Sequence, residues 1–259
     1  MSLALDLYSP GHSWLHRLDP RVKLCGMLLG MVTTFLLPHP WQQASFLLGM
    51  HFVLFSAGVP WRMLSWLWRQ MVVLVGFILI LQPFFTPSGA SLVAWGPLRL
   101  TWGGIERAAL LALRALSMAF VTGGVLFTTE QTMLVRAFVR LGLPYKWGLM
   151  LALTLRFIPA IQSLFNTVRE AQAARGWMPA RELKGNIIRR AREYIPVLVA
   201  VIIGMLRLSD QLTLALAARG LASERRRTVW RDLRMQCWDW AFLVGEIGVF
   251  LWLLFWRFG

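Results

Sequence analysis

Residues 104–128 read GIERAALLALRALSMAFVTGGVLFT, an apolar run long enough to cross a bilayer as a single helix. A transmembrane helix needs about 20 mostly apolar residues. Similar segments lie at 22–37, 42–59, 67–84 and 237–257, although the first two are short or contain polar interruptions. We therefore expect an all-α integral membrane protein with about five transmembrane helices.

The composition of the chain supports insertion into a lipid bilayer. Its 259 residues are 57% hydrophobic, include 14 Trp and 12 Met, and carry a formal net charge of +15. A basic protein can bind nucleic acid, but that activity does not account for long apolar runs. In membrane proteins, basic residues accumulate on the cytoplasmic side. The bilayer is therefore an expected partner, and nucleic acid is not.

The basic residues also predict an orientation. The N-terminal arm and the connection that holds Arg62 and Arg69 are basic, whereas the connection before the fourth span has only Arg99. This alternation predicts a cytoplasmic N-terminus, and the fifth span would then place the C-terminus outside.

The chain divides into three parts on this interpretation. Residues 1–128 hold the N-terminal arm and four spans, residues 129–236 form a cytoplasmic coupling region, and residues 237–259 form the last span. The middle part has 18 of the 27 basic and 7 of the 12 acidic residues. Its apolar stretches at 143–168 and 195–218 are long enough to span the bilayer. If the first one crossed, however, the basic cluster between the two stretches would lie outside the cell, against the positive-inside rule. We expect both to lie along the membrane face or dip into it.

The middle part reads as three helices, at about 130–141, 145–175 and 187–219, with Pro159 and Pro196 as bends in the second and third. The second and third helices end in the same tetrapeptide, Ala-Ala-Arg-Gly, at 173–176 and at 217–220. Termination by a left-handed glycine, with an arginine near the negative end of the helix dipole, explains either copy alone.

The spacing of the two copies favours a further role. Arg175 follows Pro159 by 16 residues and Arg219 follows Pro196 by 23. The difference of seven is about two helical turns, so each arginine keeps nearly the same face relative to its proline. Two similar helices that end in an exposed arginine suit two similar docking partners, because a guanidinium binds acidic groups bidentately.

Four motifs, in order, carry a resemblance to a known family. They are HRLDPRVK (16–23), FTTEQTMLVRAF (127–138), LRFIPAIQSLFNTVREAQAARG (155–176) and AARG (217–220). Through most of its length the chain resembles the transmembrane T subunit of energy-coupling factor (ECF) transporters, the CbiQ/EcfT family. The resemblance implies an ABC-type importer of a vitamin or transition-metal ion in the cytoplasmic (inner) membrane of a bacterium or archaeon. In it, the T subunit joins two ATPases to a substrate-binding membrane protein, the S component.

The resemblance also implies residue roles. Each motif arginine would dock into one ATPase, and the implied docking set is Ala174, Arg175, Gly176, Ala218, Arg219 and Gly220. ATP and Mg would be bound by the ATPases, with no cofactor, metal or catalytic residue in this chain. Small or flexible residues would let the coupling helices cross closely and repack against an S component. The hypothesised contacts are Ala200, Gly204 and Met205.

Two other classes of protein are less well supported. The chain has no P-loop, HExxH or GxSxG motif, and its acidic residues are scattered, which disfavours an integral membrane enzyme. A stand-alone secondary transporter is expected to show matched halves, and the charge concentrated between the fourth and fifth spans disfavours that symmetry. The four histidines show no metal-ligand spacing, and the two cysteines form no CxxC motif.

Two further features concern the spans themselves. Asp19 and Pro20 are expected to cap and begin the first one. Arg114 lies inside the fourth, where a charge usually faces a partner or a cavity. Structural pairing and a contact or relay role both stay open for Arg114.

Overall fold

The computed structural model describes residues 8–11, 13–85, 91–95, 98–176, 192, 194–221 and 235–258. The chain forms two compact units, one made of residues 1–144 and 233–259 and the other of residues 145–232. The division therefore falls inside the region 129–236 that the sequence analysis treats as one part.

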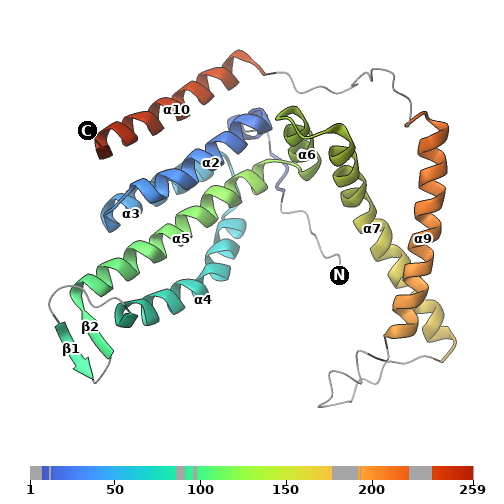
Figure 1. Cartoon of the computed structure of the whole chain (residues 1–259), viewed down its shortest axis with the longest axis horizontal. Coiled ribbons are helices and arrows are strands. Elements are labelled where there is room, and N and C mark those ends of the chain that lie inside the picture. The colour runs from blue at the N-terminus through green and yellow to red at the C-terminus, as the bar shows by residue number, and fades with distance from the viewer. Residues whose placement is uncertain are drawn as a thin grey trace. The chain divides into compact units, whose positions relative to one another are not determined.

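The first unit is built of helices and one hairpin (Figure 1). Its helices are α1 (Trp14–Arg17), α2 (Pro20–Leu36), α3 (Pro40–Ser56), α4 (Trp61–Phe85), α5 (Trp102–Thr128), α6 (Gln131–Arg140) and α10 (Cys237–Phe258). Strands β1 (Ser91–Trp95) and β2 (Leu98–Thr101) pair antiparallel between α4 and α5. The sequence predicts only a connection here, because the strands are short and border two long apolar helices. The described residues are all-α apart from this hairpin.

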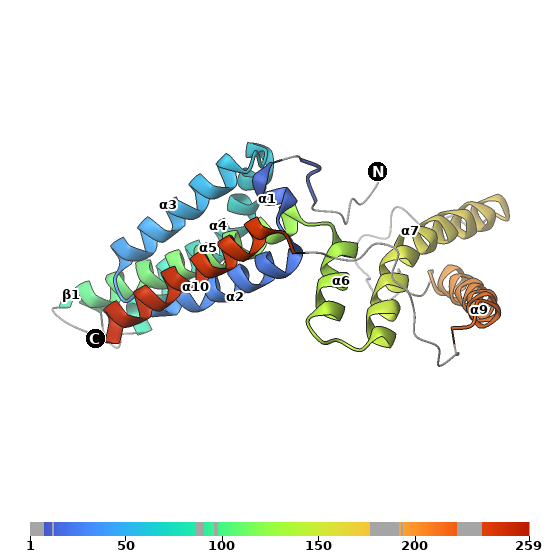
Figure 2. The same ribbon diagram turned by 90° about the horizontal axis from the view of Figure 1, so that it is seen from above.

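Helix α5 is the centre of the first unit. It packs against α2, α3 and α4, while α10 lies along α2 (Figures 1 and 2). Close packing on α5 depends on Gly123 and Gly124, since a Cβ at either position would lie 2.9 Å from a leucine side chain of α4 or α3. Phe120 and Phe127 on the same helix are almost completely buried. The N-terminal half of the chain therefore folds around the segment with which the sequence analysis began.

His51 is a core residue and not a metal ligand among the described residues. Its Nδ1 lies 2.8 Å from the Leu47 carbonyl, and the Trp68 indole N–H donates to its Nε2 at 3.0 Å. Because an indole nitrogen only donates, Nε2 accepts and the proton is on Nδ1. The ring also packs on Phe120, 4.2 Å between centroids. His51 therefore ties α3 to α4 and α5.

Arg114 pairs within the protein. Its Nε donates to the Thr34 carbonyl at 3.0 Å, and its guanidinium lies 4.9 Å from the centroid of the Phe35 ring. Thr34 is in the last turn of α2, where carbonyls lack helical partners and the helix dipole is negative. Of the two roles left open for Arg114, the structure shows the structural one.

Asp19 caps α2 as expected, and it belongs to a buried polar network at that end of the helix. The Asp19 carboxylate accepts from the Arg21 N–H, and the Asp19 N–H donates to Asp239 Oδ1 of α10 at 2.9 Å. Lys23 Nζ donates to the Thr128 carbonyl and to Thr129 Oγ1, at 2.9 and 3.1 Å. The network fastens α2 to the first turn of α10 and to the end of α5.

Five helices of the described chain are long and apolar enough to cross a membrane: α4, α5, α7, α9 and α10. Three of them match predicted spans. Helices α2 and α3 have 17 residues each, which at 1.5 Å per residue is short of a hydrocarbon core of about 30 Å. Helices α7 and α9, which lie in the predicted cytoplasmic region, also have the length and composition of a span.

The second unit contains α7 (Tyr145–Ala174) and α9 (Ile195–Ala218), which pack together. Helix α7 continues through Pro159. Pro196 lies in the first turn of α9, directly after Ile195. A proline fits there because it replaces an N–H that has no helical acceptor. Residues 187–191 of the predicted helix lie outside the described residues, so the bend at Pro196 stays a prediction. Helix α6 matches the predicted helix at 130–141, but its Ala137 packs on Leu24 and Val125 of the first unit.

Candidate functional site

The two helices that end in Ala-Arg-Gly run antiparallel. A Cβ built on Gly204 of α9 would lie 3.0 Å from Leu164 of α7, so the helices are in close contact there. Farther along α9, a cavity is lined by residues 212–219 of α9 and by residues 153–157 of α7. As the residue number rises along α9 it falls along α7. The two motifs therefore end the pair at opposite ends.

Helical geometry gives the size of this separation. Arg175 follows Leu164 by 11 residues, and Arg219 follows Gly204 by 15. At 1.5 Å per residue, each arginine lies about 16–23 Å along its helix from the contact, in opposite directions. The structure brings the two helices together but keeps their arginine ends apart.

Both ends have the geometry that the sequence predicts for a helix terminus. Gly176 and Gly220 have φ of +86° and +73°, in the left-handed region that favours glycine. The Gly176 N–H donates to the Ala173 carbonyl at 3.0 Å, and the Gly220 N–H donates to the Ala217 carbonyl at 2.9 Å. The chain thus turns away immediately after each arginine.

The motif arginines are exposed and carry uncompensated charge. Arg175 and Arg219 are both in the exposed class, as are the alanines before them, Ala174 and Ala218. Within the described ranges neither guanidinium has an ion pair or a side-chain hydrogen bond. Small neighbours and an open guanidinium leave room for a partner to approach closely.

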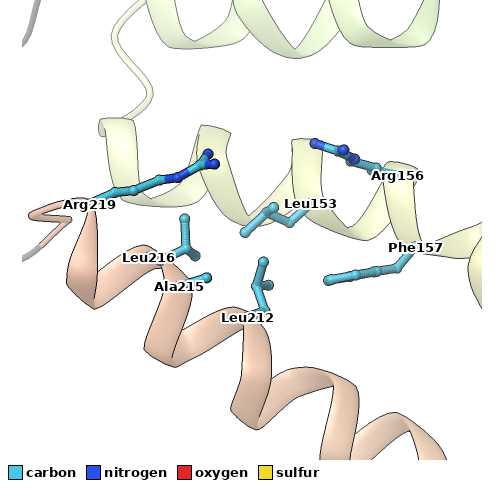
Figure 3. A pocket seen from close by; sticks show the side chains of 7 residues that line it. All are labelled: Leu153, Arg156, Phe157, Leu212, Ala215, Leu216 and Arg219. Atoms are coloured by element: carbon cyan, nitrogen blue, oxygen red, sulfur yellow. The ribbon is translucent and has the colours of Figure 1, made fainter.

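An open cavity of about 280 Å³ lies beside Arg219 (Figure 3). Helix α9 lines it with Leu212, Ala215, Leu216 and Arg219, and helix α7 with Leu153, Arg156 and Phe157. The two arginines extend toward one another from the two helices, along one side of the cavity. Sequence reasoning missed Arg156, although the antiparallel order of two helices joined by a connection would have placed it near Arg219.

The three residues predicted to contact an S component, Ala200, Gly204 and Met205, are partly buried on α9. Gly204 lies where α9 meets α7. The exposed apolar surface of α9 is instead a stripe of large side chains at helical spacing. It comprises Ile195, Leu198, Val199, Ile202, Ile203 and Leu206, each 46–61% exposed. Spacing of three and four residues would have identified this stripe from the sequence.

The described residues contain no group of three or more His, Cys, Asp or Glu side chains that could hold a metal ion. The second unit thus presents two exposed arginines at helix ends and an exposed apolar stripe on α9. The long apolar helices define the class of the protein, an all-α membrane protein.

Comparison with known proteins identifies the family. The chain matches CbiQ, the cobalt transport protein family, over residues 11–230. It is 30% identical to the energy-coupling factor transporter transmembrane protein EcfT of Streptococcus equi, over 97% of this chain and 96% of that relative. The EcfT of Listeria innocua is 29% identical over 98% and 97% of the two chains. The chain belongs to the CbiQ/EcfT family of transmembrane transporter components.

Another relative has a similar sequence within a larger protein. A putative ABC transporter ATP-binding protein of Bifidobacterium longum is 34% identical over 94% of this chain, but the match covers only 32% of that relative.

Proposed function

We propose that this chain is the energy-coupling T subunit of an ECF-type importer, which transmits movement from two cytoplasmic ATPases to a substrate-binding S component. The observation that carries the proposal is a pair of exposed arginines at the ends of α7 and α9, neither of which has an ion pair or side-chain hydrogen bond within the described ranges. Two separate ends suit two ATPase subunits. The Bifidobacterium relative, which is named an ATP-binding protein and is about three times as long as the match, supports an association with an ATPase.

In this role the work of the chain is mechanical. ATP and Mg are bound by the ATPases, whose approach on ATP binding moves Arg175 and Arg219 and the helices that bear them. Because α7 and α9 pack against each other at Gly204, a displacement of either end is transmitted to the other helix. The chain itself supplies no catalytic residue. The transported substrate is a vitamin or a transition-metal ion, set by the S component.

The S component is proposed to bind the second unit. The stripe on α9 exposes six large aliphatic side chains, which require lipid or an apolar partner to cover them. Ala200 and Met205 are on the same helix as the stripe and complete the proposed surface. The close contact at Gly204 fixes the separation of α7 and α9 and, with it, the position of the stripe.

The protein is proposed to lie in the cytoplasmic membrane with its N-terminus inside. The basic N-terminal arm and the basic residues between 129 and 236 support this orientation. ATPase docking requires both Arg175 and Arg219 to face the cytoplasm. Because these arginines end an antiparallel pair at opposite ends, α7 and α9 are proposed to lie along the membrane face and not to cross the bilayer.

The test of ATPase docking is co-purification. The full chain is co-expressed with ATPase subunits from its own genome, as wild type and as Arg175→Glu, Arg219→Glu and the double variant. We expect each single variant to loosen the complex and the double variant to abolish it. Arg169→Glu and Arg207→Glu are matched controls, because each reverses an exposed charge on the same two helices outside the motifs. A double variant that assembles and supports uptake like wild type would refute the proposed function.

The S-component surface is tested separately. Ile202→Gln makes the exposed stripe more polar, and Gly204→Leu wedges α7 from α9. We expect both to reduce co-purification of the S component while ATPase binding survives in Ile202→Gln. Retention of the S component by both variants would show that it binds elsewhere.

A further inference from the structure

The cavity in the second unit makes the two arginine ends chemically different. Of the two motif arginines, only Arg219 is among the residues that line it. Arg219 is joined there by Arg156, which belongs to the other helix and lies outside both motifs. The end of α9 therefore presents two guanidinium groups beside an apolar cavity.

The charge around this cavity is unbalanced. Its lining contains two arginines, four aliphatic residues and one phenylalanine, and no carboxylate. The described parts of the chain provide neither arginine with an ion pair or a side-chain hydrogen bond. The guanidinium groups extend toward one another (Figure 3). The two positive guanidinium groups repel each other. An anion between them offsets this repulsion, because it attracts both groups.

The size and lining of the cavity indicate which kind of chemical group occupies it beside the anion. Small-molecule sites usually enclose about 300–1,000 Å³, whereas an apolar cavity of about 150 Å³ holds a benzene ring. A cavity of about 280 Å³ is therefore suited to one large apolar side chain. Leu153, Phe157 and Leu212 supply apolar contacts for such a side chain.

We propose that the Arg156–Arg219 cavity is a two-point docking site for one ATPase, which inserts a large apolar side chain and places a neighbouring Asp or Glu carboxylate between the arginines. This inference rests on the proposed function. Carboxylates accept bidentate hydrogen bonds from guanidinium groups. Interfaces gain most of their affinity where an apolar side chain fills a pocket next to such a pair.

In this site Arg156 is a specificity-determining contact for the ATPase. The ends of α7 and α9 then differ in the groups that they offer to an ATPase. Arg219 acts with a second arginine and a cavity. An ATPase surface that fits the end of α9 must combine an acidic and an apolar side chain. Arg175, at the end of α7, does not line this cavity, so the ATPase surface that binds there need not have that combination.

The test is the affinity of the purified full chain in detergent for its ATPase, measured by biolayer interferometry. We expect Arg156→Gln to weaken binding at least fivefold. Ala215→Leu, which adds a side chain at the cavity, should weaken it by a similar factor without removing charge. Arg156→Lys should give an intermediate loss, since it keeps the charge but loses the planar fork. Arg207→Gln on α9 is the control and should stay within twofold of wild type.

A double variant tests whether the two arginines share one ligand. If they bind the same carboxylate, Arg156→Gln with Arg219→Gln will weaken binding by less than the product of the two single losses. Losses that multiply would show independent contacts and would overturn the two-point site. Monodisperse elution on size exclusion confirms that each variant is folded.

The other outcomes separate this inference from the proposed function. If the wild type binds no ATPase, the proposed function fails. If Arg219→Gln weakens binding while Arg156→Gln and Ala215→Leu match wild type, the inference fails and the proposed function stands. Native mass spectrometry with added phosphatidylglycerol tests a lipid as the occupant. Loss of bound phosphatidylglycerol in Arg156→Gln, with unchanged ATPase affinity, would make the cavity a lipid site and overturn the inference.

Discussion

Replacing Lys23 by methionine should destabilise the first unit more than any other removal of a lysine charge among the described residues. Lys23 is 6% exposed, and its ammonium donates to the Thr128 carbonyl and to Thr129 Oγ1. The buried carboxylates of Asp19 and Asp239 act on the same charge. Methionine retains most of the volume and loses the charge, so the substitution isolates the polar contribution of the lysine from its packing.

The expected loss of stability follows from the buried polar groups that lose their contact with the lysine. Without the ammonium, the Thr128 carbonyl and the Thr129 hydroxyl lose a donor. The buried Asp19 and Asp239 carboxylates lose one nearby positive charge, although Arg21 Nε stays 3.9 Å from Asp19 Oδ1. Removal of one partner from a buried charge cluster typically costs about 3–5 kcal/mol. In a protein of this size 1 kcal/mol corresponds to about 2–4 °C of melting temperature. The melting temperature of Lys23→Met should therefore fall by about 6–20 °C.

Thermal unfolding of the purified protein in detergent measures this fall. Lys146→Met is the matched control, because it makes the same substitution at an exposed position of the second unit. Asp239→Asn in the Lys23→Met background should recover part of the loss, since it removes one uncompensated charge. The reasoning is refuted if Lys23→Met melts within 2 °C of Lys146→Met, given the scale of about 2–4 °C per kcal/mol.

Three further substitutions test local features of the fold by the same melting assay. Gly220→Ala forces an L-residue into a φ of +73° and should cost about 1 kcal/mol, whereas an unchanged melting point would show that the turn relaxes. Arg114→Met removes the 3.0 Å bond to the Thr34 carbonyl and should cost about 1.5–3 kcal/mol, so full stability would contradict its structural role. Gly26→Ala would place a Cβ 2.8 Å from Cδ of Glu246 and should cost about 1–3 kcal/mol. Glu246→Ala should relieve that crowding in the double variant.

Much of the fold follows from local sequence properties. An apolar run of 25 residues predicts a helix whatever it packs against, so α5 and α10 are found within two residues of their predicted ends. The cap at Asp19 and the glycine ends of α7 and α9 were also predictable, because each depends on residues within one helical turn.

The contacts that hold these helices together were not predictable from local patterns. Lys23 reaches Thr128 across 105 residues, and the Asp19 N–H reaches Asp239 across 220. Short-range spacing contains no information about such pairs.

The repeated tetrapeptide shows how far identical short sequences predict identical binding sites. Both copies form the same local turn, with a left-handed glycine after an exposed arginine. Their surroundings differ, because antiparallel packing brings the start of α7, and with it Arg156, to the end of α9. The local turn is set by the motif, whereas the charge and the cavity beside Arg219 are set by the partner helix. Under the proposed function, the two ATPases therefore meet the same arginine in different settings, and substitutions at Arg175 and Arg219 should differ in their effect on binding.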